Sequence, residues 1–141
     1  PLLYKLLAVL LQKRLTPILD SQLSKEQAGF RKSFCTIDHL HALSMIQEKT
    51  AEWQIPLWTC FIDFEKAFDI VEQSPLWAVL ESQGAPQHLT ALLQSLYRDQ
   101  EAYVKTGVAA RYFPLARGVK QGDPISALLF IAVMQACFAE L

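Results

Sequence analysis

The chain has 141 residues, of which 52% are hydrophobic and 19% are charged, and its formal net charge is −1. This composition excludes a disordered chain and is sufficient for one domain with a buried core. The near-neutral total excludes an overall basic excess, yet residues 1–35 carry +4, residues 36–101 carry −7 and residues 102–141 carry +2. Two basic ends around an acidic middle suit a phosphate backbone that passes a metal centre, although ordinary solvated surfaces produce the same distribution.

Apolar residues that recur every three to four positions, combined with residues that start and stop helices, predict four helices. They cover residues 2–18, ending near Pro17; residues 36–55, capped by Thr36; residues 74–84, stopped by Gly84; and residues 86–97, opened by Pro86. Residues 21–35, between the first two helices, lack periodicity and are predicted to form a loop with a basic centre.

Strand signals are fewer than helix signals. Residues 57–64 are rich in aromatic and β-branched side chains and predict a short buried strand, and the segments on either side of Gly107 predict a hairpin. After a turn at residues 117–122, Asp123 as N-cap and Pro124 as first helical residue predict a last helix that runs to Leu141. Long helices with a few strands that do not alternate regularly indicate an α+β fold.

The three cysteines, Cys35, Cys60 and Cys137, are an odd number without metal-ligand spacing, so we expect buried thiols in a reducing compartment. The longest unbroken apolar stretch, residues 127–134, is far shorter than a membrane span, and no signal peptide is visible. We therefore expect no membrane association. The chain starts at a proline and stops within an apolar run, which is typical of a piece of a longer protein.

Asp63 is the first candidate for chemistry. It lies near the end of the predicted strand among apolar neighbours, where an unpaired carboxylate costs free energy. Phosphoryl-transfer enzymes place aspartates at strand ends because a rigid element can hold Mg²⁺ there. A capped or salt-bridged aspartate is also compatible with this position, so both interpretations stay open.

The second candidate is the segment 117–124, RGVKQGDP. Its two glycines allow close approach of the backbone, its two basic residues suit phosphates, and a helix N-terminus follows. An ordinary turn with a helix cap has the same composition, so this pattern by itself is weak.

Several segments taken together are more specific than either candidate alone. Residues 61–69, FIDFEKAFD, resemble the first catalytic motif of reverse transcriptases from non-LTR (LINE-type) retrotransposons, and residues 121–126, QGDPIS, with 128–130, LLF, resemble the second palm motif. Upstream, residues 26–32, EQAGFRK, with 36–40, TIDHL, resemble the fingers motif, and RL at 14–15 with PIL at 17–19 is similar to a still earlier segment. The motifs occur in the family's order and cover nearly the whole chain.

The resemblance implies an α+β right-hand polymerase, with fingers-type segments at about residues 1–56 and an incomplete palm at about residues 57–141. The family's third motif, aromatic-Ala-Asp-Asp, and its thumb do not occur in these residues, and SFC at 33–35 stands where a Gly-Arg-Ser type sequence is common. Two-metal catalysis needs carboxylates from the first and third motifs. The 141-residue chain alone is therefore expected to be inactive.

Functional residues are carried over by position. Asp63 matches the catalytic aspartate that binds both Mg²⁺ ions, and Phe64 could offer only its backbone carbonyl to a metal. Phe68 matches the aromatic gate whose ring occupies the space of a ribose 2′-OH, although a plain core role stays open. Gln121 and Gly122 match the turn that lies against the incoming nucleotide and the template.

Arg31 matches the basic residue of the fingers motif and is assigned to nucleotide binding, whereas Asp69 is interpreted as a helix-start residue. The implied function is an RNA-directed DNA polymerase that uses an RNA template, a DNA primer, dNTPs and two Mg²⁺ ions, with Mn²⁺ as a substitute. Such a protein is expected inside the cell, in cytoplasm and nucleus. The alternatives are a non-catalytic RNA-binding remnant of a decayed element and an unrelated helical interaction module.

Overall fold

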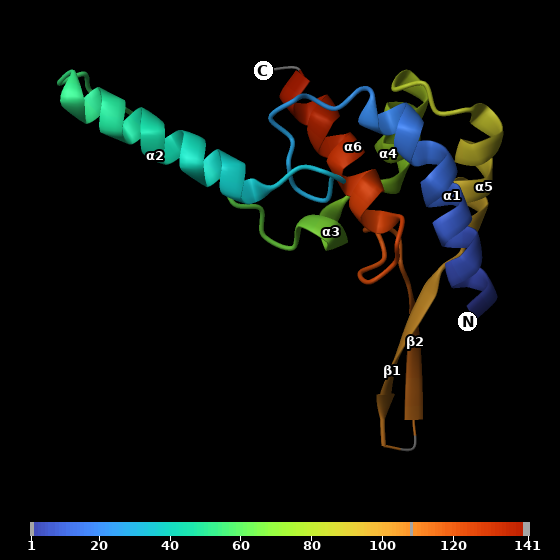
Figure 1. The fold of residues 1–141 in the computed structure, drawn as a ribbon. Helices are drawn as coiled ribbons and strands as arrows, with labels where there is room; N and C mark the ends of the chain where they lie inside the picture. Colours follow the sequence, from blue (N-terminus) through green and yellow to red (C-terminus); the bar gives the residue numbers. More distant parts are fainter. Residues whose placement is uncertain (1, 108, 140–141) are drawn as a thin grey trace. The chain divides into compact units, whose positions relative to one another are not determined.

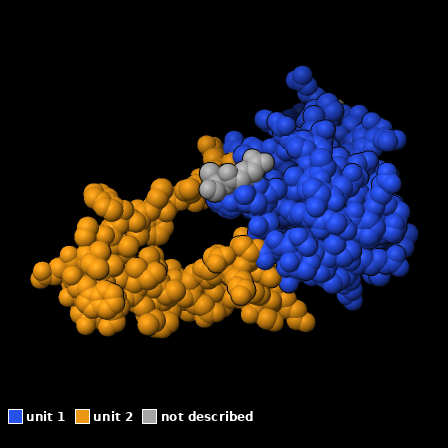
Figure 2. Space-filling view, turned by 90° about the horizontal axis from the view of Figure 1, so that it is seen from above, with its two compact units in different colours: residues 1–23, 66–141 blue, residues 24–65 orange. Residues whose placement is uncertain are grey.

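The computed structural model of the chain describes residues 2–107 and 109–139. These residues form two compact units, which Figure 2 colours separately. Unit 1 consists of Pro1–Leu23 and Lys66–Leu141, and unit 2 consists of Ser24–Glu65. Segments from the two ends of the sequence therefore build one core together. The boundary between fingers-type and palm-type segments near residue 56 stays a prediction.

Four longer helices provide the core of unit 1 (Figure 1). They are α1 (Leu2–Asp20), α4 (Gln73–Ser82), α5 (Gln87–Tyr97) and α6 (Ser126–Ala139). Helix α6 contacts both α4 and α1, and α4 contacts α5. The buried residues of α1 are spaced by three or four positions, so one face of the helix enters the core: Ala8, Leu11, Leu15 and Leu19. Each fully buried leucine stabilises the fold by about 1.5–3 kcal/mol.

The boundary between α4 and α5 follows the prediction, whereas the end of α1 does not. Gly84 lies just after α4 with a φ of +86°, and Pro86 is the N-cap of α5, as predicted. Helix α1, however, continues through Pro17 to Asp20, so the predicted end near Pro17 was wrong. A proline removes one hydrogen bond of its helix, but Leu15 and Leu19, on either side of Pro17, are both fully buried, and their burial favours continuation of the helix.

The predicted hairpin is confirmed. Strand β1 (Glu101–Thr106) pairs with β2 (Ala109–Pro114) in an antiparallel register, and Gly107 in the connection has a φ of +59°. Helix α6 begins at Ser126 rather than at Pro124, and its predicted continuation to Leu141 lies outside the described residues. In the part of the chain that the structure describes, several helices accompany this single two-stranded sheet, which confirms the helix-rich α+β fold.

Unit 2 contains helix α2 (Thr36–Glu52) and irregular segments on either side of it. The N-cap position of α2 is occupied by Cys35, and no side chain makes a capping hydrogen bond there. Thr36 therefore does not have the predicted capping role. Residues 57–64 form no strand, and Trp58 and Phe61 are 91% and 80% exposed, so the predicted buried strand was wrong. An extended segment becomes a strand only when a neighbour pairs with its N–H and C=O groups, and none of the described residues does so.

The cysteines also differ from expectation. Cys35, Cys60 and Cys137 are free thiols, as expected from their odd number, but all three are exposed rather than buried. Two of them lie in unit 2, whose helix buries none of its residues, so this unit has no core that could enclose a thiol.

Candidate functional site

The end of the first palm-type motif, from Lys66 onward, meets the segment that leads into the second motif, and both belong to unit 1. The first motif ends in a short helix, α3 (Ala67–Ile70), and the second begins with the turn before α6. Two backbone hydrogen bonds join α3 and the residue after it to the segment just before this turn: the Val119 N–H donates to the Phe68 carbonyl at 2.8 Å, and the Gly118 N–H donates to the Val71 carbonyl at 2.7 Å. Next to these bonds, Glu72 and Arg117 form an isolated antiparallel bridge. Residues about fifty positions apart are thereby held in a defined register.

Gly118 allows this close approach of two backbones. Its φ is +92°, which side-chain-bearing residues rarely adopt, and a Cβ at this position would lie 2.9 Å from the carbonyl oxygen of Asp69. The sequence argument that a glycine permits close backbone approach therefore holds for Gly118. The approaching group is the first motif of the same chain.

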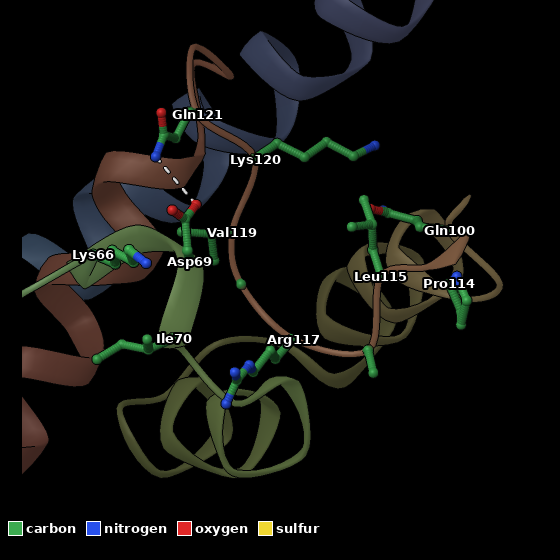
Figure 3. A pocket seen from close by; sticks show the side chains of 12 residues that line it. Lys66, Asp69, Ile70, Gln100, Pro114, Leu115, Arg117, Val119, Lys120 and Gln121 are labelled. Atoms are coloured by element: carbon green, nitrogen blue, oxygen red, sulfur yellow. Dashed lines mark hydrogen bonds between the residues drawn. The ribbon is translucent and has the colours of Figure 1, made fainter. Parts of the chain in front are cut away.

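An open pocket of about 710 Å³ lies along this junction, which is within the usual size range of ligand sites. Figure 3 shows the side chains around it. The residues that line it come from α3 and its N-terminal neighbour, from the residue before β1, and from the end of β2 and the segment after it: Lys66, Asp69, Ile70, Gln100, Pro114, Leu115, Ala116, Arg117, Gly118, Val119, Lys120 and Gln121. Three of these side chains are cationic and one is anionic, so the lining favours a polyanionic ligand.

Gln121 is tied to the first motif by its side chain. Its Nε2 donates a hydrogen bond to Oδ1 of Asp69 at 3.1 Å, across 52 positions of sequence (Figure 3). Asp69 lies in the first turn of α3, which agrees with its interpretation as a helix-start residue. Its second role as the acceptor for Gln121 was missed, because the sequence contains no signal of which turn would face this helix.

Gly122 and Phe68, the two other unit 1 residues assigned to the site by resemblance, have environments that differ from that of Gln121. Gly122 has a φ of +78°, and no atom lies within 4 Å of the position that a Cβ would take, so this corner of the turn is open. Phe68 is half-buried and packs against the core, where its ring stacks on Phe130 with centroids 4.9 Å apart. Phe68 therefore contributes to packing, and its role as a sugar gate stays a prediction.

Lys120 is a half-buried cation at the edge of the pocket, and Figure 3 shows its side chain pointing away from the Gln121–Asp69 pair. Burial lowers the pKa of its ammonium group, while the nearby Asp123 carboxylate acts in the opposite direction. Its Nζ lies 4.3 Å from the centroid of the Tyr4 ring. Burial, and then a hydrogen bond to Asp123, raises the pKa of Tyr4 well above its ordinary value.

Asp63, Phe64 and Arg31 belong to unit 2. Asp63 and Phe64 lie in the exposed irregular segment that precedes α3. Arg31 has local contacts: its Nη1 donates to the Ser24 carbonyl at 2.7 Å, and its guanidinium carbon lies 4.0 Å from the centroid of the Phe34 ring. The structure therefore shows Arg31 organising its own loop, and its assignment to nucleotide binding stays a prediction.

The fit to a divalent metal is limited within the described residues. No three His, Cys, Asp or Glu side chains gather there in a way that could hold an ion. The assignment of Asp63 and the Phe64 carbonyl as metal ligands stays a prediction, and a complete two-metal site needs further carboxylates. None of the described helices has the length and apolar character needed to cross a membrane.

Comparison with known proteins gives a consistent result. The family model described as "Reverse transcriptase (RNA-dependent DNA polymerase)" matches residues 1–141. The chain is 36% identical over 88 residues to the retrovirus-related Pol polyprotein from type-1 retrotransposable element R2 of Nasonia vitripennis, covering 60% of this chain and 8% of that protein. It is 27% identical over 138 residues to the corresponding polyprotein from type-2 retrotransposable element R2DM of Drosophila melanogaster, covering 93% of this chain and 13% of that protein.

A third relative is the Pol polyprotein from type-1 retrotransposable element R2 of Popillia japonica, 28% identical over 141 residues, covering 99% of this chain and 20% of that protein. The chain therefore spans a fifth or less of the length of these curated relatives. No solved structure matches it.

Proposed function

The chain belongs to the reverse transcriptase (RNA-dependent DNA polymerase) family, and from this premise we propose that a protein containing it copies the RNA of a non-LTR retrotransposon into DNA. The observation that supports this most is the hydrogen-bonded junction between the two palm-type motifs beside a pocket lined by Lys66, Arg117 and Lys120. A nucleoside triphosphate is a polyanion, and a cationic pocket on a rigid backbone junction suits its phosphates.

Each residue has a defined role in this proposal. Gln121, oriented by Asp69, and Gly122, on the open corner of the turn, lie against the incoming nucleotide and the template. Phe68 restricts the space for a ribose 2′-OH. Asp63, with the Phe64 carbonyl, contributes to binding the catalytic metal ions. When bound, two Mg²⁺ ions stabilise the charge that develops on the transferred phosphoryl group.

The proposed partners are an RNA template, a DNA primer and dNTPs, and the proposed location is intracellular, in cytoplasm and nucleus. A primer-extension assay tests the activity. A longer protein that contains this chain together with the third motif is incubated with a primed RNA template, dNTPs and Mg²⁺ or Mn²⁺, and template-dependent extension is expected. The 141-residue chain is the matched control and should give no product, because it contains no Asp-Asp pair.

The assay also distinguishes the alternative function. If the longer protein retains an intact third motif and binds primed RNA but does not extend the primer under any metal condition, the chain belongs to an RNA-binding remnant. If it neither binds RNA nor extends the primer, the polymerase proposal is wrong.

Sugar selection provides a second test, which addresses Phe68. In an active protein, Phe68→Val should raise ribonucleotide incorporation relative to deoxynucleotide incorporation by about tenfold, which corresponds to about 1.4 kcal/mol of discrimination. The smaller side chain leaves room for the 2′-OH without removing a hydrogen bond. The measurement is the ratio of kcat/KM for matched dNTP and rNTP substrates.

Phe130→Val is the matched control for this substitution, because Phe130 is the partner of Phe68 in the stacked pair of rings. The control removes the same stacking contact but keeps the Phe68 ring. It should lower thermal stability without changing the sugar ratio. An equal change of the ratio in both variants would show that packing alone determines it, and an unchanged ratio in Phe68→Val would assign Phe68 to the core.

A further inference from the structure

Residues 120–123 form a tight turn in which Gln121 and Gly122 are the two central residues. The Asp123 N–H donates to the Lys120 carbonyl at 3.2 Å, which closes the turn. The φ of +78° at Gly122 is the value that the third position of a type II turn requires. The position of Gln121 and Gly122 therefore depends on what holds the first and last residues, Lys120 and Asp123.

Both of these residues are held by Tyr4 of helix α1. The Tyr4 hydroxyl donates a hydrogen bond to Oδ2 of Asp123. The other carboxylate oxygen, Oδ1, accepts from the Ile125 N–H at 3.4 Å, so the two oxygens connect the turn to α1 and to the start of α6. On the other side of the turn, the ammonium group of Lys120 lies over the Tyr4 ring, 4.3 Å from its centroid, and 5.8 Å from the centroid of Tyr97 on α5.

We infer that Tyr4 is a positioning residue for the Gln121–Gly122 turn, acting through Lys120 and Asp123. Helix α1 precedes all residues carried over as site residues, yet it fixes both ends of the turn that the proposed function places against the nucleotide. Gln121 is then held from two directions: the side chains at the two ends of its turn contact Tyr4 on α1, and its own side chain is hydrogen-bonded to Asp69 on α3.

This inference rests on the proposed function for its kinetic consequence but not for its structural one. Loss of the Tyr4 contacts should let the turn move, which weakens nucleotide binding while leaving the metal-binding groups unchanged. The ring of Tyr4 is half-buried and packs only against the outside of the core, whereas Leu76, Leu80 and Leu93 are fully buried within it, so α4 and α5 should be unaffected. A merely structural role would instead loosen α4 and α5 together with the turn.

The experiment uses a longer protein that contains this chain, with Tyr4→Phe and Tyr4→Leu as variants. Tyr4→Phe removes the hydroxyl but keeps the ring over Lys120, and Tyr4→Leu removes both contacts. Tyr103→Phe is the matched control, because Tyr103 lies on the hairpin opposite Tyr112 and is 62% exposed. Amide hydrogen exchange of residues 120–126 is compared with that of α4 and α5, and the KM for dNTP is compared with kcat.

We expect faster exchange in residues 120–126 with unchanged exchange in α4 and α5, more strongly in Tyr4→Leu than in Tyr4→Phe. The KM for dNTP should rise by about tenfold in Tyr4→Phe, as for the loss of one hydrogen bond to a charged group, with kcat less affected. Unchanged exchange at the turn, or equally faster exchange in α4 and α5, would overturn the inference. If the unsubstituted protein does not extend primers, the proposed function is wrong, and the exchange measurements alone decide the role of Tyr4.

Discussion

Replacement of Asp63 by Asn is expected to abolish primer extension by a protein that contains this chain, while RNA binding is retained. The substitution removes a negative charge that the proposed metal ions need and changes the shape of the side chain very little. Asp63 lies in an exposed segment, so no packing is lost with the charge. Loss of the metal-binding charge should reduce the rate by a factor of about 10³ or more, or at least ~4 kcal/mol in the barrier.

Asp99→Asn is the matched control for this prediction. Asp99 lies between α5 and β1 with a φ of +53°, a conformation that asparagine tolerates well, and the substitution removes the same charge outside the candidate site. Primer extension should be close to that of the unsubstituted protein. Activity of Asp63→Asn above a small percentage of the original rate would show that Asp63 is not a metal ligand.

Gly118→Ala should have the largest effect on stability among the glycine substitutions in this segment. A side-chain-bearing residue at a φ of +92° costs about 1–2 kcal/mol. The added Cβ would lie 2.9 Å from the backbone oxygen of Asp69, which cannot move as a flexible side chain does, so backbone displacement adds about 1–2 kcal/mol more. We expect a total loss of about 2–4 kcal/mol, measured by denaturant unfolding of a protein that contains the chain.

Gly122→Ala separates the two causes. Gly122 also has a positive φ, of +78°, but nothing lies within 4 Å of its Cβ position. Its substitution should therefore cost only the conformational part, about 1–2 kcal/mol. Equal losses in the two variants would mean that the approach of the Gly118 backbone to α3 does not contribute to stability.

The sequence was sufficient for the elements that depend on local signals. Gly84 and Pro86 mark the end of α4 and the start of α5 because glycine adopts a positive φ and proline fits a helix start. The hairpin around Gly107 was predictable for the same kind of reason. The family could also be predicted, because motifs spread over nearly the whole chain resemble those of one enzyme family, and the family model matches residues 1–141.

The predictions that failed needed information from other parts of the chain. Residues 57–64 have the composition of a strand, but a strand also needs a partner for its backbone, and composition does not provide one. Pro17 is a local signal for the end of a helix, but the helix continues with Leu15 and Leu19 buried on either side of the proline, and this burial depends on the rest of the core. In both cases a tertiary contact, or its absence among the described residues, decided the outcome.

The same distinction between local signals and tertiary contacts applies to the candidate site. The sequence by itself determined which residues match the family's motifs, and from these matches it predicted Asp63, Phe68, Gln121 and Gly122 as site residues. Only the tertiary structure decided that Gln121 is bonded to Asp69 and that Tyr4 holds the turn at Asp123, across 52 and 119 positions of sequence. The physical reason is that a motif consists of residues that are neighbours in the sequence, so it can be recognised without the fold. A hydrogen bond between distant residues exists only after packing of the helices has brought donor and acceptor within bonding distance.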